Sequence, residues 1–504
     1  MKFNSRKIYI ALFIFSIFVM AFFLRSQETL SGNFLFLLDS GRDMMDVKGI
    51  VFDHKLTLIG PYTSLGGVFQ GPLYYYLLAI PTFIFQGNPW GNILLMLIIS
   101  LVTIFIAFYF TNKYFGLTAA VVTFTLFAFS PEAVAAATYF WNPHPMWLIL
   151  TFYVFALFGA LKKNSLMQIL LWPLIALSFH FEMAFGFFLF AATFIYVICF
   201  QRKIFFNKKI ILSLFLSFLL FMPQILFDLR HDFLMSGSVV EILKGNNQGL
   251  ITSGEAEGFV SVKINNLNTL KHNFISSFIY DQQFSAFPVL IFIATIVAVV
   301  YSLKKKIFTV DEKLFLKSLS IIIVIILALG ILYPFPLRYW FLTGFQSFYL
   351  IIIGLILSKI FKFRIGKIIL VLIMIVMSIY FINRINTLYI NPPNEGGAAK
   401  IKGKIEAIDF IYNDSKDREF GIIIFTPPVI TDAYDYLIWW HGSKKYGYIP
   451  HSKKSGTVYL LIEPDTNQPW SYKGWLETII KTGDVVYTKT LSSGIIIQKR
   501  NFSN

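Results

Sequence analysis

Eleven long apolar segments constrain the fold of this chain more than any other feature of its sequence. A helix that crosses the hydrocarbon core of a bilayer needs about 17–25 residues, and most of the segments reach that length. Two of them, at 117–131 and 165–180, are shorter and are expected to extend into their flanks. We therefore predict an all-α polytopic membrane protein whose spans cover residues 8–25, 91–110, 117–131, 144–161, 165–180, 183–200, 210–227, 286–303, 318–334, 345–361 and 367–385.

The composition supports a membrane protein and argues against a soluble protein that binds nucleic acid. Of the 504 residues, 56% are hydrophobic and 14% are charged, whereas soluble domains contain about 25% charged residues. The net charge of +16 would suit nucleic acid in a soluble chain. Here the basic residues stand in short loops between apolar segments, as the positive-inside rule requires. We expect membrane lipids, and no nucleic acid, as partners. The single cysteine, Cys199, allows no disulfide within the chain.

One further apolar stretch, Pro72–Phe85, decides the orientation. As a helix it would reach about 21 Å, less than the hydrocarbon core of about 30 Å, and Pro81 interrupts it. If it does not cross, the basic loops share the side of the N-terminus, and the short loops opposite contain only Arg338. We therefore predict a cytoplasmic N-terminus on a retained signal anchor and outer loops at 26–90 and 228–285. Tyr74–Tyr76 would then anchor the chain at the outer membrane interface.

The chain divides into two predicted domains. Residues 1–385 form the transmembrane domain, and residues 386–504 form an extracytoplasmic α/β domain behind the turn-rich linker Asn391–Gly397. No catalytic motif is recognised in the second domain, and its His441 and His451 are expected to be solvated surface residues. Its expected elements are a strand at Gly421–Phe425, a helix around Ala433–His441, a strand at Val458–Ile462 and a hairpin near Val485–Lys499.

Acidic residues open the first outer loop. In a helix, Asp39 and Asp43 lie at positions i and i+4, so their carboxylates share one face, and Asp46 lies close to it. Carboxylates beside a membrane, with apolar flanks, are candidates for a raised pKa and for proton transfer. A solvated amphipathic helix on the membrane explains the same spacing. The segment Gly60–Tyr76 is rich in Gly and Pro and can bring backbone N–H groups to an anion, but it holds no nucleotide-binding motif.

Further polar residues face the same predicted side. Trp141 and Asn142 follow the third span, and His180 and Glu182 follow the fifth; each pair either binds a polar group or ends a helix at the interface. The lone Arg338 either pairs with a phosphate or reaches toward lipid headgroups. Ion-coupled carriers usually place charges near the bilayer midplane. The one-sided pattern here favours an outer-face active site on a membrane scaffold.

The order of these motifs resembles the GT-C membrane glycosyltransferases. Asp39–Asp43 stands where the family has an Asp-Glu pair, and Gly71–Tyr75 stands where it has His-Pro-Pro-Leu-Tyr-Tyr. Lys113–Gly116 matches a short turn, and Trp141–Pro143 stands where many members have Leu-Asp-Pro. The likeness is closer to the branch of protein O-mannosyltransferases and aminoarabinose transferases, which use polyprenyl-phosphate-linked sugars. Since Ser40 replaces the expected Glu, the acid is Asp39 alone or is shifted to Asp43.

The resemblance implies a polyprenyl-phosphate-linked sugar donor and transfer, with inversion, to a glycan, lipid or protein acceptor at the plasma or inner membrane. Asp39 or Asp43 is implied as the catalytic base. Arg338, with Arg230 or the Gly-rich loop, is implied to hold the phosphate. The resemblance implies no certain cofactor. No residue cluster requires a divalent metal, and whether one takes part stays open. The other implied substrate-binding residues are Arg42, Pro72, Tyr74, Trp141, Asn142, His180, Glu182 and Tyr339.

Two other functions stay open at this point. A flippase or transporter for lipid-linked saccharides predicts polar residues along the spans and inverted internal repeats. A non-catalytic envelope assembly protein predicts that the acidic helix tolerates alanine.

Overall fold

The computed structural model describes residues 5–202, 208–244, 259–279, 307–360, 381–383, 385–390, 397–415, 419–465 and 467–503. The predicted spans at 286–303 and, for the most part, 367–385 lie outside the described residues. The first 390 residues contain α1 (Ser5–Ser31), α2 (Leu38–Val51), α3 (Leu73–Ile84), α4 (Trp90–Phe115), α5 (Leu117–Phe129), α6 (Pro131–Ala135), α7 (Met146–Leu161), α8 (Ser165–Phe181), α9 (Met183–Phe200), α11 (Lys208–Arg230), α12 (Leu234–Leu243), α13 (Phe259–Ile275), α15 (Val310–Leu332), η2 (Tyr339–Leu342), α16 (Gln346–Ile360) and η3 (Asn386–Ile390).

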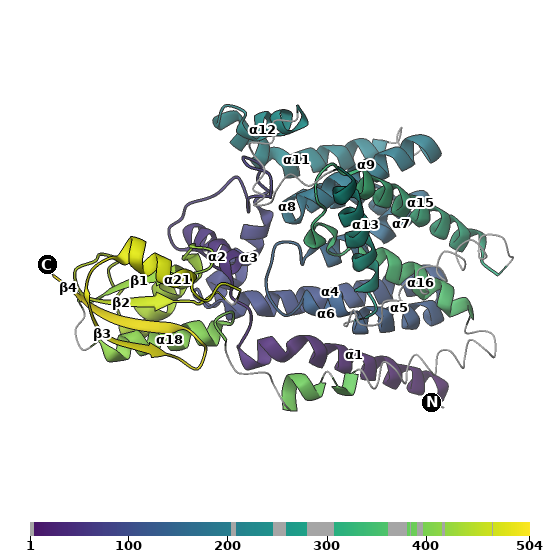
Figure 1. Cartoon of the computed structure of the whole chain (residues 1–504). Helices are drawn as coiled ribbons and strands as arrows, with labels where there is room; N and C mark the ends of the chain where they lie inside the picture. Colours follow the sequence, from purple (N-terminus) through teal and green to yellow (C-terminus); the bar gives the residue numbers. More distant parts are fainter. Residues whose placement is uncertain are drawn as a thin grey trace.

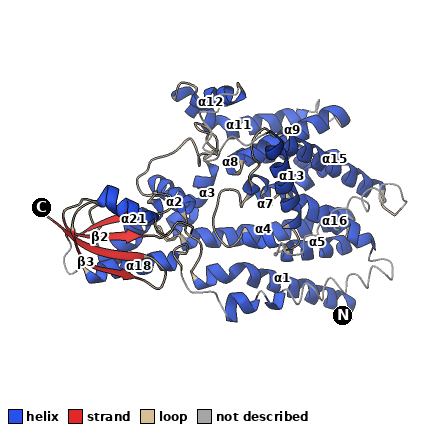
Figure 2. Ribbon diagram, in the orientation of Figure 1, coloured by secondary structure: helices blue, strands red, loops and turns tan. Residues whose placement is uncertain are grey.

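The molecule has two visibly different parts (Figure 1). Apolar helices lie side by side in the larger part, and a small domain with the C-terminus sits at one end of them (Figure 1). Among the described residues, the strands β1 to β4 all belong to this small domain (Figure 2). The predicted fold class, a helical membrane protein with a small C-terminal α/β domain, is confirmed.

Helix length separates two groups among the apolar helices. Within the described residues, α1, α4, α9, α11 and α15 are long and apolar enough to cross a membrane, whereas α3, α5, α7, α8 and α16 are shorter. Helix α5 ends at Phe129 because Pro131 keeps the preceding residue, Ser130, extended at ψ 123°. Helix α1 does not end at Arg25, as the apolar run suggested, but continues to Ser31. A buried set of hydrogen bonds from Arg25 to Ser100, Phe127 and Ala128 explains the difference.

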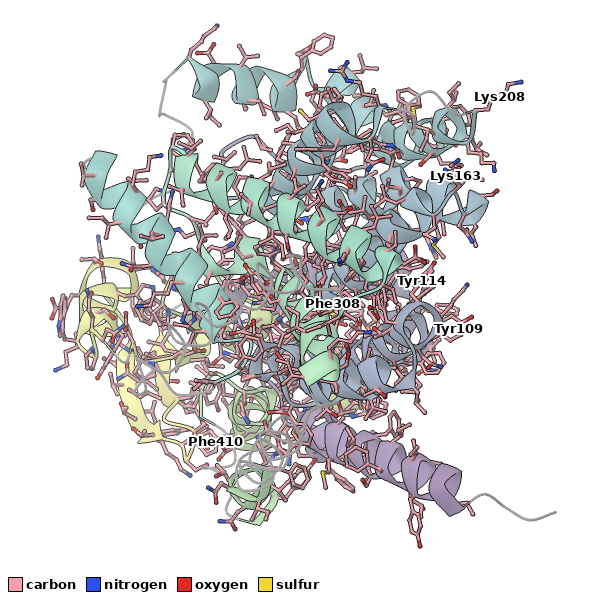
Figure 3. The ribbon with its side chains drawn as sticks, turned by 90° about the vertical axis from the view of Figure 1, so that its right-hand side faces the viewer. Tyr109, Tyr114, Lys163, Lys208, Phe308 and Phe410 are labelled. Carbon is pink, nitrogen blue, oxygen red and sulfur yellow. The ribbon has the colours of Figure 1, made fainter. Side chains whose placement is uncertain are left out.

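Among the described residues, basic side chains that include Lys163 and Lys208 lie at the end of the helices away from the small domain (Figure 1, Figure 3). Lys162 Nζ bonds Asp311 Oδ1 at 2.7 Å, and Lys209 bonds Ser165. Figure 3 looks onto this end and shows Lys163 and Lys208 on neighbouring helix ends. The described basic helix ends and the acid-bearing α2 thus lie at opposite ends (Figure 1, Figure 3). The assignment of these ends to the cytoplasm and the outer face stays a prediction.

The small domain is built on a four-stranded sheet of order β1-β2-β4-β3. Strands β1 and β2 pair in parallel, and the β2–β4 and β4–β3 pairs are antiparallel. The predicted strands, helix and hairpin are all present. The elements are α18 (Ile401–Asp414), β1 (Gly421–Phe425), α19 (Asp432–Leu437), η4 (Ile438–Gly442), α20 (Ser443–Tyr446), β2 (Gly456–Ile462), α21 (Ser471–Trp475), η5 (Leu476–Ile480), β3 (Asp484–Thr490) and β4 (Ile496–Phe502).

The two histidines of this domain are not free surface residues, so that prediction was wrong. The ring of His441 is partly buried, and its Nε2 lies 2.7 Å from Asp409 Oδ1. His451 packs against Gly421, and its Nδ1 accepts the Lys453 N–H at 3.1 Å. Both rings complete local hydrogen-bond networks, which the linear sequence does not reveal.

Candidate functional site

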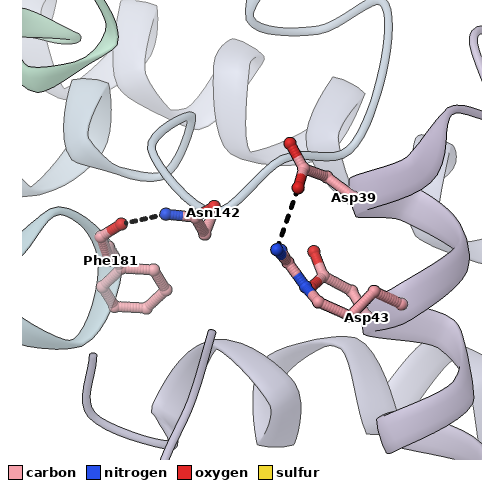
Figure 4. A network of polar contacts seen from close by, with 5 residues as sticks. Asp39, Asp43, Asn142 and Phe181 are labelled. Carbon is pink, nitrogen blue, oxygen red and sulfur yellow. Dashed lines mark hydrogen bonds and ion pairs between the residues drawn. The ribbon is translucent and has the colours of Figure 1, made fainter. Parts of the chain in front are cut away.

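Helix α2 carries the acidic residues, and Asp39 and Asp43 share one face as predicted. Arg42 lies between them: its Nη1 donates to Asp39 Oδ1 at 2.9 Å, and its Nε and Nη2 donate to Asp43 Oδ1 at 2.9 and 2.7 Å. The second oxygen of Asp39 points away from this bond (Figure 4). The side chain of Asp39 is 44% exposed, whereas that of Asp43 is fully buried. The two acids are therefore not equivalent.

Burial and pairing set the charges of this cluster. Burial raises the pKa of Asp43 to about 7, although Arg42 opposes the shift. Within the described residues, Asp43 Oδ2 is buried without a hydrogen-bond partner. Burial alone would lower the pKa of Arg42, but the carboxylates of Asp43 and Asp39 raise it above its ordinary value. Arg42 therefore stays charged and holds Asp39 in one position.

A cavity of about 610 Å³ opens in front of this cluster. It brings together residues from α2, the Gly-rich loop, the turn before α7, the turn between α8 and α9, and the segment around η2. Of the residues predicted for the site, the cavity is lined by Asp39, Arg42, Trp141, Asn142, Glu182 and Tyr339. Residues from five distant parts of the chain thus meet where the sequence predicted one site.

The Gly-rich segment forms one wall of the cavity. Its ends pair through Gly60 N–H to Gln70 O at 2.8 Å and Gln70 N–H to Pro61 O at 2.9 Å. Between them, Gly67 takes a φ of +75°, which favours glycine. The ring of Tyr62 lies 4.7 Å from the Arg42 guanidinium, a cation–π contact. The predicted rigid loop is present, but it contributes the aromatic ring of Tyr62, which sequence reasoning missed.

Three predicted residues lie behind the cavity wall. Gly71 approaches His180 so closely that a Cβ would stand 1.9 Å from the ring Nδ1. The His180 Nε2–H donates to Leu220 O at 3.1 Å, and Nδ1 faces the Leu73 N–H at 3.5 Å. Pro72 and Tyr74 are buried beside this contact. The structure places these residues as supports of the loop, outside the lining of the cavity.

The prediction that Tyr74–Tyr76 anchor the chain at the membrane interface is wrong, because these rings contact protein. Tyr74 and Tyr75 are 0% and 3% exposed. The Tyr74 ring lies 6.3 Å from Phe181, and Tyr75 bonds Asp46. Tyr76 donates its hydroxyl to Thr57 O at 2.8 Å. The three rings contact protein because α3 packs between α2 and α4, an arrangement that hydropathy does not show.

Glu182 and Asn142 form the floor of the cavity. Glu182 is the N-cap of α9, where its Oε1 accepts the Ala184 N–H at 3.3 Å. Burial raises the pKa of Glu182 to about 8. Asn142 Nδ2 donates to Phe181 O at 2.7 Å. The floor is therefore polar but neutral at pH 7.

The two arginines predicted to hold a phosphate lie at different places. Arg338 is exposed, and its guanidinium lies 6.0 Å from the ring of Trp340, which lines the cavity together with Tyr339. Arg338 is thus at the cavity rim. Arg230 is exposed at the end of α11 and does not line the cavity.

An apolar groove of about 660 Å³ adjoins the cavity. It runs between α8, α9, α11 and α12, and its polar lining residues include Ser217, Gln224 and Asp228. Met183 and Phe187 line both spaces. A ligand with a polar head and a long apolar tail can therefore occupy the two together.

Within the described residues, no group of three or more His, Cys, Asp and Glu side chains is placed to hold a metal ion.

Comparisons with known proteins agree with this architecture. Residues 70–227 match the family model described as dolichyl-phosphate-mannose-protein mannosyltransferase. The crystal structure of ArnT from Cupriavidus metallidurans bound to undecaprenyl phosphate is similar over 97% of this chain and 98% of its own, with a TM-score of 0.60 and 10% identity. AglB, the Archaeoglobus fulgidus oligosaccharyltransferase, in complex with an inhibitory peptide and a dolichol-phosphate is similar over 96% of this chain and 74% of its own, with a TM-score of 0.51 and 13% identity.

No curated protein sequence matches this chain. At the identities given, the structural likeness shows a shared fold. Together with the family match, it confirms the resemblance to GT-C proteins that the order of motifs predicted.

Proposed function

From this GT-C-like fold, we propose that the chain is a membrane glycosyltransferase that moves a sugar from a polyprenyl-phosphate carrier to an acceptor hydroxyl. The observation that carries the proposal is that two spaces adjoin each other. A cavity with the polar side chains of Asp39, Arg42 and Asn142 in its wall shares the lining residues Met183 and Phe187 with an almost entirely apolar groove. A sugar on a lipid phosphate has the same division into a polar head and an apolar tail.

The groove supports a polyprenyl tail because its lining is almost entirely aromatic and aliphatic. Burial of apolar chain stabilises binding by about 0.8 kcal/mol for each CH₂ group. The ArnT structure with a similar fold is bound to undecaprenyl phosphate. We therefore place the tail between α8, α9 and α11, with the phosphate where the groove meets the cavity.

Arg338 is the residue that we assign to the phosphate. A guanidinium matches phosphate oxygens through parallel N–H bonds, and Arg338 stands at the rim beside Trp340. Arg42, which lines the cavity, is already bound to two carboxylates. We therefore give Arg42 the role of orienting Asp39. Arg230, the last residue of α11, remains the second candidate for binding the phosphate.

Asp39 is the residue that we assign as the base. It lines the cavity and has an oxygen that is directed away from Arg42. In the proposed step, this oxygen takes the proton of the acceptor hydroxyl, and the hydroxyl oxygen forms a bond to the anomeric carbon. The bond from that carbon to the phosphate oxygen breaks, and its electron pair leaves on polyprenyl phosphate, with inversion. Positive charge from Arg338 at the leaving phosphate lowers the barrier.

The test uses the full chain in lipid nanodiscs, an undecaprenyl-phosphate-linked sugar with a radioactive label, and an extract of cell-envelope acceptors. We expect label to move into envelope material and undecaprenyl phosphate to appear in equal amount. Mass spectrometry of envelope glycans from cells with and without the protein identifies the product. Unchanged glycans together with movement of intact donor across sealed vesicles would instead support the transporter.

The neutral state of Glu182 predicts a pH dependence for donor binding. Because burial raises its pKa to about 8, Glu182 is protonated at pH 7 and becomes negative as the pH rises through that value. For a separation of about 10 Å between Glu182 and the phosphate, which the proposed placement assumes, the added charge would cost about 1.7 kcal/mol at an effective dielectric constant of about 20. Undecaprenyl phosphate is therefore expected to bind about tenfold more weakly at pH 9.5 than at about 7.5. Tryptophan fluorescence titration measures this affinity.

The matched variant for this measurement is Glu182→Gln, which keeps the shape and the neutral charge. Its affinity is expected to stay constant over the same pH range, which begins above the pKa of about 7 of Asp43. An equal decline in both proteins would show that another group causes the effect.

A further inference from the structure

The C-terminal α/β domain contributes no residue to the lining of the cavity within the described part of the chain. We infer that this domain is nevertheless part of the catalytic machinery: its helix α19 holds α2, and thereby Asp39, in the position needed for transfer. Gly41 is the positioning residue at the centre of this contact. The inference rests on the proposed function and assigns a role to the domain.

Gly41 marks the closest approach between the two helices. It is buried in α2, two residues after Asp39 and directly before Arg42. A Cβ at this position would stand 2.2 Å from the backbone N of Ala433 and 2.4 Å from its Cα. These atoms belong to the first turn of α19 and cannot turn away as a flexible side chain would. The contact therefore requires glycine and fixes the distance between α2 and the small domain.

Backbone bonds tie the entry of α2 to the same domain. The Phe36 N–H donates to Ala399 O at 3.0 Å, and the Ile401 N–H donates to Phe34 O at 3.0 Å. This short antiparallel bridge ends just before the helix starts. The N-cap residue, Leu37, provides no side-chain hydrogen bond, so the start of α2 is held by the bridge rather than by a cap of its own.

Side chains of the domain support the far end of α2. The ring of Trp439 lies 5.1 Å from Phe52 and 5.2 Å from the Lys48 ammonium. Tyr436 donates its hydroxyl to Gly87 O at 2.6 Å, which joins the domain to the turn before α4. Contacts at the entry, the middle and the end of α2 all come from one domain.

This support matters because α2 is poorly held by its own sequence. It has only 14 residues and contains two glycines, Gly41 and Gly49. Isolated helices of about this length are marginal, and each glycine costs about 1 kcal/mol relative to alanine. A general base must keep its geometry to well under 1 Å for efficient transfer. Together with the packing of α3 against α2, the domain supplies rigidity that α2 lacks on its own.

The test compares Gly41→Ala with Gly49→Ala in the full chain. A Cβ at Gly49 meets no atom within 4 Å, so this variant gains helix propensity without a clash and should keep wild-type activity. Gly41→Ala has the same gain in propensity but must push α19 away. We expect at least a tenfold fall in kcat. The Kd for undecaprenyl phosphate should be unchanged, because the described lining of the groove contains no residue of the domain.

Hydrogen–deuterium exchange supplies a second measurement that needs no substrate. Gly41→Ala should speed exchange in α2 and leave exchange in α4 and α8 unchanged, and Gly49→Ala should change neither. If Gly41→Ala fails to fold, Tyr436→Phe serves instead: it removes only the bond to Gly87 O and should lower kcat by a few fold.

The outcomes separate this inference from the proposed function. If the wild-type protein transfers no sugar, the proposed function is wrong. The hydrogen–deuterium exchange data then test only whether the domain holds α2 in position. Active wild-type protein with full kcat in a folded Gly41→Ala or Tyr436→Phe variant overturns the inference. Loss of lipid-phosphate affinity in parallel with kcat also overturns it, because it indicates general unfolding.

Discussion

Replacing Asp39 by asparagine is expected to slow sugar transfer by about two to four orders of magnitude, the usual contribution of a positioned base. The amide keeps the size and the acceptor oxygen for Arg42 Nη1, but it cannot take the proton of the acceptor hydroxyl. The Kd for undecaprenyl phosphate should stay the same, because the tail and phosphate bind elsewhere. Single-turnover transfer from the labelled donor measures the rate apart from binding.

Two variants decide which acid is the base. Asp43→Asn should lower the rate by only about tenfold, because Asp43 is buried and lies outside the cavity lining. The amide oxygen of the asparagine can still accept the hydrogen bonds from Arg42. Asp53 follows α2 and pairs with Lys48 at the surface. Asp53→Asn should leave the transfer rate unchanged. A larger loss in Asp43→Asn than in Asp39→Asn would reverse the assignment of the two residues.

Local periodicity explains why the acidic cluster could be predicted from sequence. The i, i+4 spacing of Asp39 and Asp43 needs only a helix to bring them onto one face, and α2 provides it. Trp141, Asn142 and Glu182 follow helix ends whose side of the bundle is set by the number of preceding spans. Hydropathy therefore placed them correctly near one another.

Tertiary packing explains what the sequence could not show. Tyr74 and His180 read as interfacial residues, but the close approach of Gly71 to His180 buries both behind the loop. The Tyr62 contact with Arg42 joins a loop to a helix about 20 residues away. Such contacts depend on how α3 and α8 pack, and no spacing along the chain encodes them.

Arg25 is the clearest such case, because it looked like the end of a span and is in fact fully buried. Its Nη2 donates to Phe127 O at 2.8 Å, its Nη1 donates to Ala128 O at 2.7 Å, and its Nε donates to Ser100 Oγ at 3.0 Å. Phe127 O would ordinarily accept the N–H four residues later, but that residue is Pro131, which has none. Arg25 thus supplies the donors that the end of α5 lacks.

Arg25→Met is therefore expected to destabilise the fold by about 2–6 kcal/mol, since two buried carbonyls lose their donor at about 1–3 kcal/mol each. Water cannot replace the guanidinium in an apolar helix bundle, so the loss should be close to the full cost. Unfolding by sodium dodecyl sulfate, followed by tryptophan fluorescence, measures the difference. Arg202→Met removes an exposed arginine that donates to Ile198 O and should change stability by less than about 0.5 kcal/mol. Equal stability of Arg25→Met and wild type would mean that the carbonyls find other donors, and that α1 is held to α5 by packing alone.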